Sequence, residues 1–268
     1  MKQQKPQYSV LLRTYFLKYT RYMLARSFHA VRLRNSPPAV LSHERLPLLV
    51  AVNHSSWWDL LVGGWLDCQM FGRESYGLMD EQQLQRYTIF KHMGVIGVDR
   101  SSLNGAQRFL SVCTELLYET DRTLWITPQG AIMSSYHRPI QFQPGLAHLG
   151  ASLKRFQYCH SVLHYEFGEE RLPEVFVQFS PPEYVELQTL SGAKQWMQNK
   201  QVAMEQDLDA LQAAARLHRN SEFTTLLHGG GGTVKAYDLY RKAQSRLTGR
   251  SFQPNHGDVI TPQWRERR

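Results

Sequence analysis

Short apolar runs alternate with segments of helical periodicity along most of the chain. The run LLVAV at 48–52 is apolar at every position and predicts a strand buried on both faces. The same reasoning predicts further strands at 76–79, 94–98, 123–127, 160–167 and 174–179. It predicts helices at 57–66, 80–91, 144–156 and 190–218, and one that Ser101 or Ser102 caps. This alternation predicts an α/β fold, a mixed sheet flanked by helices.

The segment 9–25 has the pattern of an N-terminal amphipathic helix. Aromatic and aliphatic residues share one side of its helical wheel: Leu11, Leu12, Tyr15, Phe16, Tyr19, Tyr22 and Met23. Polar and basic residues fall mostly on the other: Arg13, Thr14, Lys18, Thr20 and Arg21. We expect this helix to lie in a membrane interface. The alternative is a helix that packs on the domain with a solvated basic face.

Charge is distributed unevenly, and this divides the chain into three parts. The net charge is +8, and residues 1–43 carry eight Lys or Arg and no acid. We therefore expect a basic membrane-interface segment at 1–43, an α/β domain at 44–228, and a Gly-rich hinge with a basic tail at 229–268. The basic ends would attract anionic lipid headgroups or the phosphates of nucleic acid. No apolar stretch is long enough to predict a transmembrane helix.

The strand at 48–52 leads directly into the motif NHSSWWD, which contains His54 and Asp59. Imidazole has a reference pKa near neutrality, so His54 can accept a proton from a hydroxyl, and Asp59 can orient it. The chain has no G-x-S-x-G nucleophile motif, so the attacking hydroxyl would belong to the substrate. The alternative is a strand-end histidine and a carboxylate that suits the helix dipole.

Two other predicted strands end in residues suited to anions. Arg100 follows the strand at 94–98 and precedes a helix, a position that favours phosphate, although an ion pair with Asp99 is the competing interpretation. Gly130 in Pro128-Gln129-Gly130 follows the strand at 123–127 and lets backbone N–H groups approach an anion or oxyanion. The chain has three cysteines, an odd number, and they are widely spaced, which is typical of a reducing compartment.

These motifs together resemble the sequence blocks of the glycerolipid acyltransferase superfamily, the PlsC-like enzymes that include glycerol-3-phosphate and 1-acylglycerol-3-phosphate acyltransferases. NHSSWWD resembles the N-H-x4-D block, and GVIGVDR at 94–100 resembles the second block, whose arginine meets the acceptor's phosphate. TPQG at 127–130 stands where the family usually has F-P-E-G-T-R, so Gln129 replaces a glutamate. Residues 161–167 resemble the hydrophobic fourth block without its V-P pair.

The resemblance implies an O-acyltransferase that moves a fatty acyl group from acyl-CoA or acyl-ACP, the acyl carrier protein, to a lysophospholipid-type acceptor. His54 and Asp59 would be catalytic, and Arg100, Gln129 and Gly130 would bind substrate. We expect no metal and no cofactor beyond the acyl donor, a cytoplasmic protein peripherally associated with anionic membranes, and no nucleic acid partner.

The departure at Gln129 keeps other interpretations open. The acceptor could be a non-phosphorylated lipid alcohol or glycolipid, because glutamine carries no charge. The protein could instead be a catalytically inactive membrane-binding or RNA-binding module, or a hydrolase in which His54 activates water.

Overall fold

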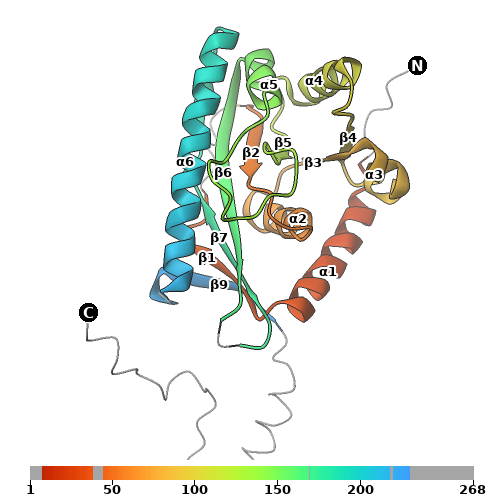
Figure 1. Ribbon diagram of the computed structural model, residues 1–268. Coiled ribbons are helices and arrows are strands. Elements are labelled where there is room, and N and C mark those ends of the chain that lie inside the picture. Colours follow the sequence, from red (N-terminus) through yellow and green to blue (C-terminus); the bar gives the residue numbers. More distant parts are fainter. Residues whose placement is uncertain (1–7, 39–44, 169, 218–219, 230–268) are drawn as a thin grey trace, which may run out of the picture.

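The computed structural model describes residues 8–38, 45–168, 170–217 and 220–229 (Figure 1). The predicted basic tail, apart from Gly229, lies outside the described residues, as do residues 1–7 and 39–43 of the predicted N-terminal segment. The predicted division into 1–43, 44–228 and 229–268 stays a prediction.

The described strands form a single mixed sheet. They are β1 (Ala30–Arg34), β2 (Leu48–Val52), β3 (Ser75–Asp80), β4 (Val95–Val98), β5 (Thr123–Ile126), β6 (Arg155–Glu166), β7 (Glu174–Phe179), β8 (Glu183–Glu186) and β9 (Phe223–His228). Within the described ranges their order is β4-β3-β5-β2-β6-β7-β1-β9, with β8 paired to β6. The first five strands of that order are mutually parallel, and β7 and β8 run antiparallel to β6.

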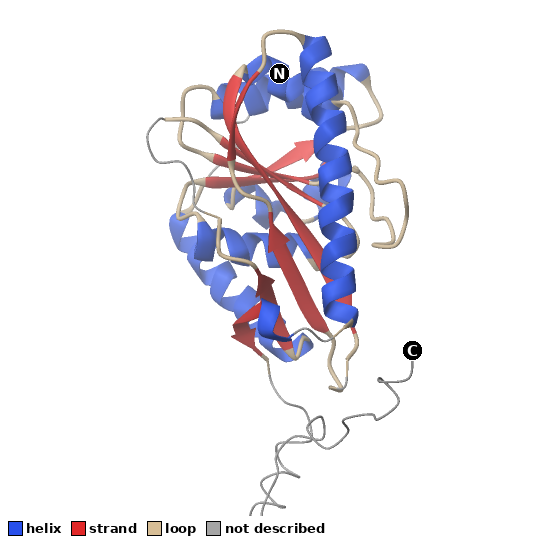
Figure 2. Ribbon diagram, turned by 90° about the vertical axis from the view of Figure 1, so that its left-hand side faces the viewer, coloured by secondary structure: helices blue, strands red, loops and turns tan. Residues whose placement is uncertain are grey.

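Helices cover both faces of this sheet, which confirms the predicted fold class. They are α1 (Val10–Ser27), α2 (Asp59–Met70), α3 (Glu81–Arg86), α4 (Leu103–Leu117), α5 (Gly145–Leu153) and α6 (Leu190–Arg216), with short 3₁₀ helices η1 (Thr88–His92) and η2 (Asn220–Glu222). The helices α1 and α2 lie on one side and α6 on the other (Figures 1 and 2). None of the described helices has both the length and the apolar character needed to span a bilayer.

Strand β2 is central because both of its faces are buried. Leu49 and Ala51 pack into one hydrophobic cluster with residues of α4, α5 and α6, whereas Leu48, Val50 and Val52 pack into a second cluster with α1 and α2. Its parallel neighbours β5 and β6 complete its hydrogen bonds on either edge. The continuous apolar run at 48–52 therefore has the buried position that its composition predicted.

Several boundaries differ from the sequence prediction. The helix predicted at 144–156 ends at Leu153, because Lys154 has a positive φ of 64° and β6 begins at the next residue. The helix predicted at 80–91 is divided at Tyr87 into α3 and η1. Strands β8 and β9 were not predicted. Strand β1 was not predicted either, because its two arginines interrupt the apolar pattern of the segment.

Strand β1 brings part of the predicted N-terminal segment into the sheet. It pairs with β7 and β9, and its two arginines find acids elsewhere in the sequence. Arg32 Nη2 lies 2.6 Å from Glu174 Oε1, and Arg34 Nη2 lies 2.8 Å from Glu222 Oε2. A strand with alternating charges is stable here because these partners, more than 140 residues away in sequence, neutralise it.

Helix α1 forms as predicted, but its faces are turned differently from the predicted wheel. Arg13, assigned to the solvated side, points inward and pairs with the buried Asp67 of α2. Thr20 and Leu24, about two and three turns further along this inner side, are buried. The Trp125 indole N–H also donates to Asp67, at 2.8 Å. This buried ion pair fixes the rotation of α1, so its tyrosines face outward.

We predict that Arg13→Met lowers the free energy of unfolding by about 3 kcal/mol, measured by denaturant titration, because it leaves the buried Asp67 carboxylate without its cation. Arg21→Met, at an exposed position of the same helix, is the matched control and should change stability by less than about 0.5 kcal/mol. Equal effects of the two substitutions would contradict the role assigned to the ion pair.

The loss of stability caused by Arg13→Met should also depend on pH. Burial raises the pKa of Asp67, against the hydrogen bonds from Ser75 and Trp125 and the charge of Arg13, which lower it. A carboxyl with a raised folded-state pKa binds its proton more tightly when folded, so acid relieves its destabilising charge. Removing Arg13 raises this pKa further. The loss caused by Arg13→Met should therefore be smaller at about pH 5 than at about pH 7.

Candidate active site

Asn53 directly follows β2 and starts the turn that carries His54. Its side chain makes two hydrogen bonds with the backbone of Leu163 in β6. Nδ2 donates to the Leu163 carbonyl at 3.0 Å, and Oδ1 accepts from the Leu163 N–H at 2.7 Å. Asn53 is buried, so this two-bond contact with β6 satisfies an amide that would otherwise be costly to bury. The chain leaves the sheet directly after it, at the carboxyl edge of the parallel strands.

His54 and Asp59 lie in contact after this turn. His54 Nδ1 is 2.9 Å from Asp59 Oδ2. The Asp59 side chain is 1% exposed and that of His54 is 23% exposed, so the carboxylate is enclosed while the imidazole reaches the surface. With the proton on Nδ1 shared with Asp59, the second ring nitrogen is left as an acceptor. The predicted pair is therefore formed in a geometry suited to general base chemistry.

The Asp59 carboxylate is held by three further donors. The backbone N–H groups of Ser55 and Ser56 donate to Oδ2 at 2.7 and 2.8 Å, and the Tyr165 hydroxyl donates to Oδ1 at 2.7 Å. Helix α2 begins after Trp58 without a side-chain cap, and Ser55 and Ser56 bind Asp59 through their backbone N–H groups. The reason is that Asp59 needs donors once it is buried.

Gln129 contacts the backbone of the same turn. Its Oε1 accepts from the His54 N–H at 2.7 Å. Three residues after Gly130 the chain returns to the same turn, where the Met133 N–H donates to the His54 carbonyl at 2.8 Å. Both backbone groups of His54 are thus tied to the loop after β5. The substrate-binding role that we predicted for Gln129 stays a prediction; its observed contact is with His54.

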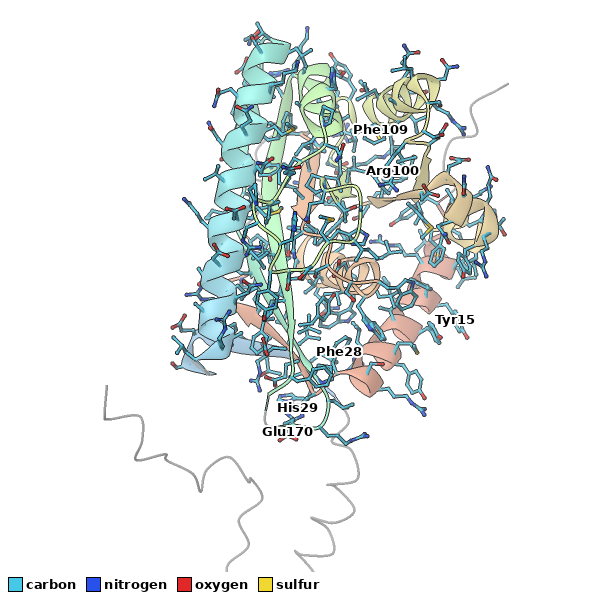
Figure 3. All side chains as sticks on the ribbon, in the orientation of Figure 1. Tyr15, Phe28, His29, Arg100, Phe109 and Glu170 are labelled. Atoms are coloured by element: carbon cyan, nitrogen blue, oxygen red, sulfur yellow. The ribbon has the colours of Figure 1, made fainter. Side chains whose placement is uncertain are left out.

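Arg100 and Gly130 lie side by side at the ends of β4 and β5. Gly130 has a positive φ of 74°, and a methyl group at its Cβ position would be 3.3 Å from Arg100 Nη1. Arg100 (labelled in Figure 3) is half exposed, and its nearest carboxylate is Asp80, at 3.7 Å. The predicted alternative partner Asp99 instead accepts hydrogen bonds from Ser101 and Ser102, which lower its pKa to about 2.

The predicted site residues thus form one connected group. His54 contacts Asp59 and Gln129, and the next residue, Gly130, lies beside Arg100. Sequence reasoning missed the roles of Asn53 and Tyr165. The asparagine was visible beside His54, whereas Tyr165 gave no local signal, because it reaches Asp59 from a strand 106 residues away.

A loop that runs from this site to α5 is fastened along α6. The backbone N–H groups of Ile140 and Phe142 donate to Glu205 and Gln201, at 2.6 and 2.9 Å. Gln212 Nε2 donates to the Ser135 carbonyl at 2.9 Å. These three partners lie along one side of α6. The helix therefore holds the loop in a position that the loop's own sequence does not fix.

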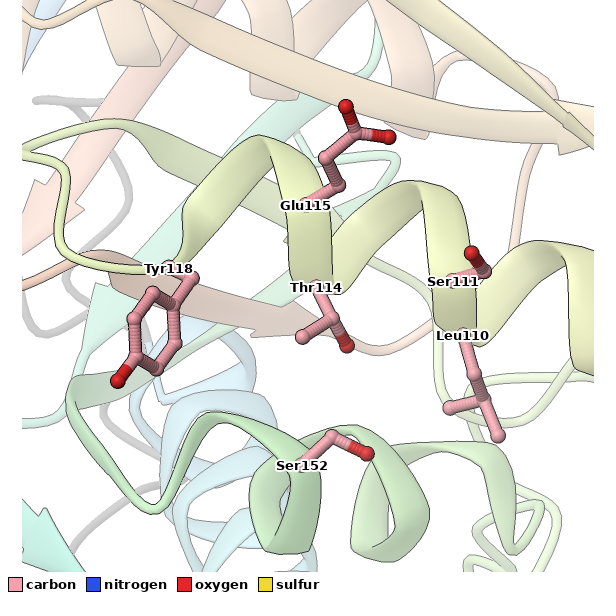
Figure 4. A pocket seen from close by; sticks show the side chains of 6 residues that line it. All are labelled: Leu110, Ser111, Thr114, Glu115, Tyr118 and Ser152. Atoms are coloured by element: carbon pink, nitrogen blue, oxygen red, sulfur yellow. The ribbon is translucent and has the colours of Figure 1, made fainter. Parts of the chain in front are cut away.

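Two further features of the described residues add no member to this group. A shallow hollow of about 550 Å³ lies between α4 and α5 (Figure 4), lined by Leu110, Ser111, Thr114, Glu115, Tyr118 and Ser152. It includes none of the predicted site residues. In the described part of the chain, no three His, Cys, Asp or Glu side chains are grouped in a way that could hold a metal ion.

A comparison of the sequence with known families finds a match over the part of the chain that contains these residues. The family model described as Acyltransferase matches residues 31–161. The chain belongs to the acyltransferase family, that of the PlsC-like glycerolipid acyltransferases. The matched part of this acyltransferase includes β2, α2 and the strand ends that carry His54, Asp59, Arg100, Gln129 and Gly130. It ends before Tyr165. No curated protein matches the chain.

We predict that Gln129→Met lowers the free energy of unfolding by about 1–3 kcal/mol, because the His54 N–H loses its acceptor. Gln129→Glu keeps an acceptor oxygen at the same distance from the backbone and should cost less. Denaturant titration of both variants measures the difference. Equal losses would show that the hydrogen bond to His54 contributes nothing to stability.

Proposed function

We propose that this acyltransferase moves a fatty acyl group from acyl-CoA or acyl carrier protein to a hydroxyl of a lysophospholipid-type acceptor. The observation that carries the proposal is the 2.9 Å contact between His54 Nδ1 and the enclosed Asp59 Oδ2. It supports a base that is oriented by a carboxylate and has its other ring nitrogen free for a substrate proton.

In the proposed reaction His54 Nε2 removes the proton from the acceptor hydroxyl. The hydroxyl oxygen attacks the carbonyl carbon of the thioester, a C–O bond forms, and the C–S bond breaks as the tetrahedral intermediate collapses. The proton passes from His54 to the departing thiolate. Asp59 stays ionised and stabilises the imidazolium between the two steps.

Arg100 and Gly130 would stabilise the negative charges of the acceptor phosphate and of the tetrahedral intermediate. The exposed Arg100 guanidinium has one neighbouring carboxylate among the described residues, the loosely placed Asp80, so it can turn to a phosphate. Gly130 has a left-handed backbone and no side chain, so an oxyanion could approach the backbone that follows it, while its own N–H donates to the Thr127 carbonyl at 3.0 Å. We assign acceptor phosphate to Arg100, and assign stabilisation of the tetrahedral oxyanion to the Gly130 region.

The Gln129 replacement does not by itself favour an uncharged acceptor. Its side-chain oxygen binds the His54 N–H, a bond that the usual glutamate could make equally well. A contact with the backbone of the catalytic turn requires an acceptor atom and not a charge. The choice between a phosphorylated acceptor and a neutral lipid alcohol therefore depends on Arg100.

We propose further that the outer face of α1 holds the enzyme on an anionic membrane. Leu11, Tyr15 and Tyr22 are 84%, 72% and 56% exposed, and Tyr15 points away from the body of the protein in Figure 3. The exposed Lys18 and Arg21 lie on the same helix, which has no acidic residue. Aromatic side chains with interspersed cations suit the boundary between headgroups and acyl chains.

An aromatic contact chain connects this helix to the catalytic turn. Phe28 at the end of α1 packs against Trp58, with ring centroids 5.0 Å apart, and Trp58 packs against Trp57 at 5.4 Å. Trp57 is itself mostly exposed and lies three residues after His54. A membrane that receives α1 would thus lie near the site, so a lipid acceptor could reach His54 without leaving the interface.

The decisive experiment is acyl transfer from a labelled long-chain thioester to a panel of lysophosphatidate, other lysolipids and neutral lipid alcohols. We expect transfer by the wild type and a loss of about a thousandfold in His54→Ala, since a general base contributes that order of rate. His92→Ala, at an exposed histidine of η1, is the matched control and should keep full activity.

The acceptor that is used identifies the substrate class. Arg100→Met should raise KM for lysophosphatidate about tenfold or more and leave a neutral acceptor unaffected. No transfer by the folded wild type to any acceptor would overturn the proposal in favour of a binding module. Release of free fatty acid in the presence of every acceptor would identify a hydrolase.

We predict that wild-type protein sediments with vesicles that contain anionic phospholipid, and much less with purely zwitterionic vesicles. The double substitution Lys18→Gln with Arg21→Gln should weaken binding roughly 30-fold, at about 1 kcal/mol for each charge. Lys194→Gln on α6, on the opposite side of the sheet, is the control and should bind normally. Binding that is equal on both vesicle types, or unaffected by the double substitution, would refute the assignment of this face.

A further inference from the structure

The two oxygens of Asp59 have different surroundings. Oδ2 receives His54 Nδ1 and the backbone N–H groups of Ser55 and Ser56, all from the turn in which Asp59 itself lies. Oδ1 receives the Tyr165 hydroxyl at 2.7 Å, from the far end of β6. One side of the carboxylate is therefore held locally, and the other is held by a single long-range donor.

Tyr165 is fixed from several directions. Its backbone is paired with Val175 in the β6–β7 ladder. Its ring packs near that of Phe28, with centroids 5.8 Å apart, and Phe28 in turn packs on Trp58 just before Asp59. A phenol held at both its backbone and its ring can point its hydroxyl in one direction at little entropic cost.

We propose that Tyr165 is a positioning residue for the His54–Asp59 pair. Its hydroxyl keeps the plane of the Asp59 carboxylate turned so that Oδ2 meets His54 Nδ1, and it draws off part of the negative charge that would otherwise act on the imidazole. Without it, Oδ1 would lose its donor in an enclosed site, and rotation about the Cβ–Cγ bond, which has broad minima, would be less restricted.

Tyr165 keeps its proton over the range in which a histidine titrates. Burial, followed by the Asp59 charge and the hydrogen bond to it, raises the pKa of Tyr165 well above its ordinary value. Within the described residues, the titratable side chains in hydrogen-bond contact with Asp59 are His54 and Tyr165. A change at Tyr165 should therefore be visible in the titration of His54.

The test is Tyr165→Phe in the full chain, which keeps the ring and removes the hydroxyl. We expect the NMR titration midpoint of the His54 imidazole to move to higher pH by roughly half a unit to one unit, because the Asp59 charge is no longer shared. This readout needs no turnover, so it stands even if the proposed function fails. If acyl transfer occurs, kcat should fall about tenfold with KM nearly unchanged, and the acidic limb of the rate profile should shift likewise.

Tyr158→Phe is the matched control. Tyr158 lies on the same strand and is fully buried, and its hydroxyl has no hydrogen-bond partner among the described residues, so its removal should leave the His54 titration unchanged. An unchanged titration in folded Tyr165→Phe would overturn the proposal. Should that variant not fold, 3-fluorotyrosine at position 165, a stronger donor, must move the His54 midpoint to lower pH, and a midpoint that does not move would refute the role.

Discussion

The burial of one negative charge organises this site. A carboxylate removed from water costs several kcal/mol unless donors surround it, and Asp59 has four. Two come from the backbone of Ser55 and Ser56, which can reach it only if the chain turns tightly after β2. The third is the imidazole of His54, and the fourth comes from Tyr165 on β6. Satisfying Asp59 therefore sets the shape of the turn, the start of α2 and the orientation of His54.

The sheet makes this arrangement possible by supplying rigid neighbours. Strand β2 lies between β5 and β6 with both faces buried, so its carboxyl end has little freedom. Asn53 closes that end against β6, and Gln129 joins it to the end of β5. The loop that follows is held along α6 by its backbone N–H groups. Rigid elements thus support a site whose own residues lie mostly in turns.

Helix α1 shows how a tertiary contact can override a local pattern. Its sequence places most aromatic residues on one side of the helical wheel and Arg13 on the other, solvated side. The Arg13–Asp67 pair lies inside instead, and the buried charge of Asp67 has no other cation among its contacts in the described residues. The rotation that satisfies Asp67 leaves the tyrosines in solvent. An exposed aromatic face beside cations is the feature that links the fold to a lipid surface.

The sequence alone was sufficient for the α/β class, the buried strand at 48–52, the His54–Asp59 pair and the order of the strand ends that carry Arg100 and Gly130. These features depend on short-range periodicity and on spacings of a few residues, which local sequence records. Strands β1, β8 and β9, the inward side of α1, and the bond from Tyr165 to Asp59 were decided by the tertiary structure. Each depends on partners far away in the sequence, and the energies that select them arise only when burial brings those partners together.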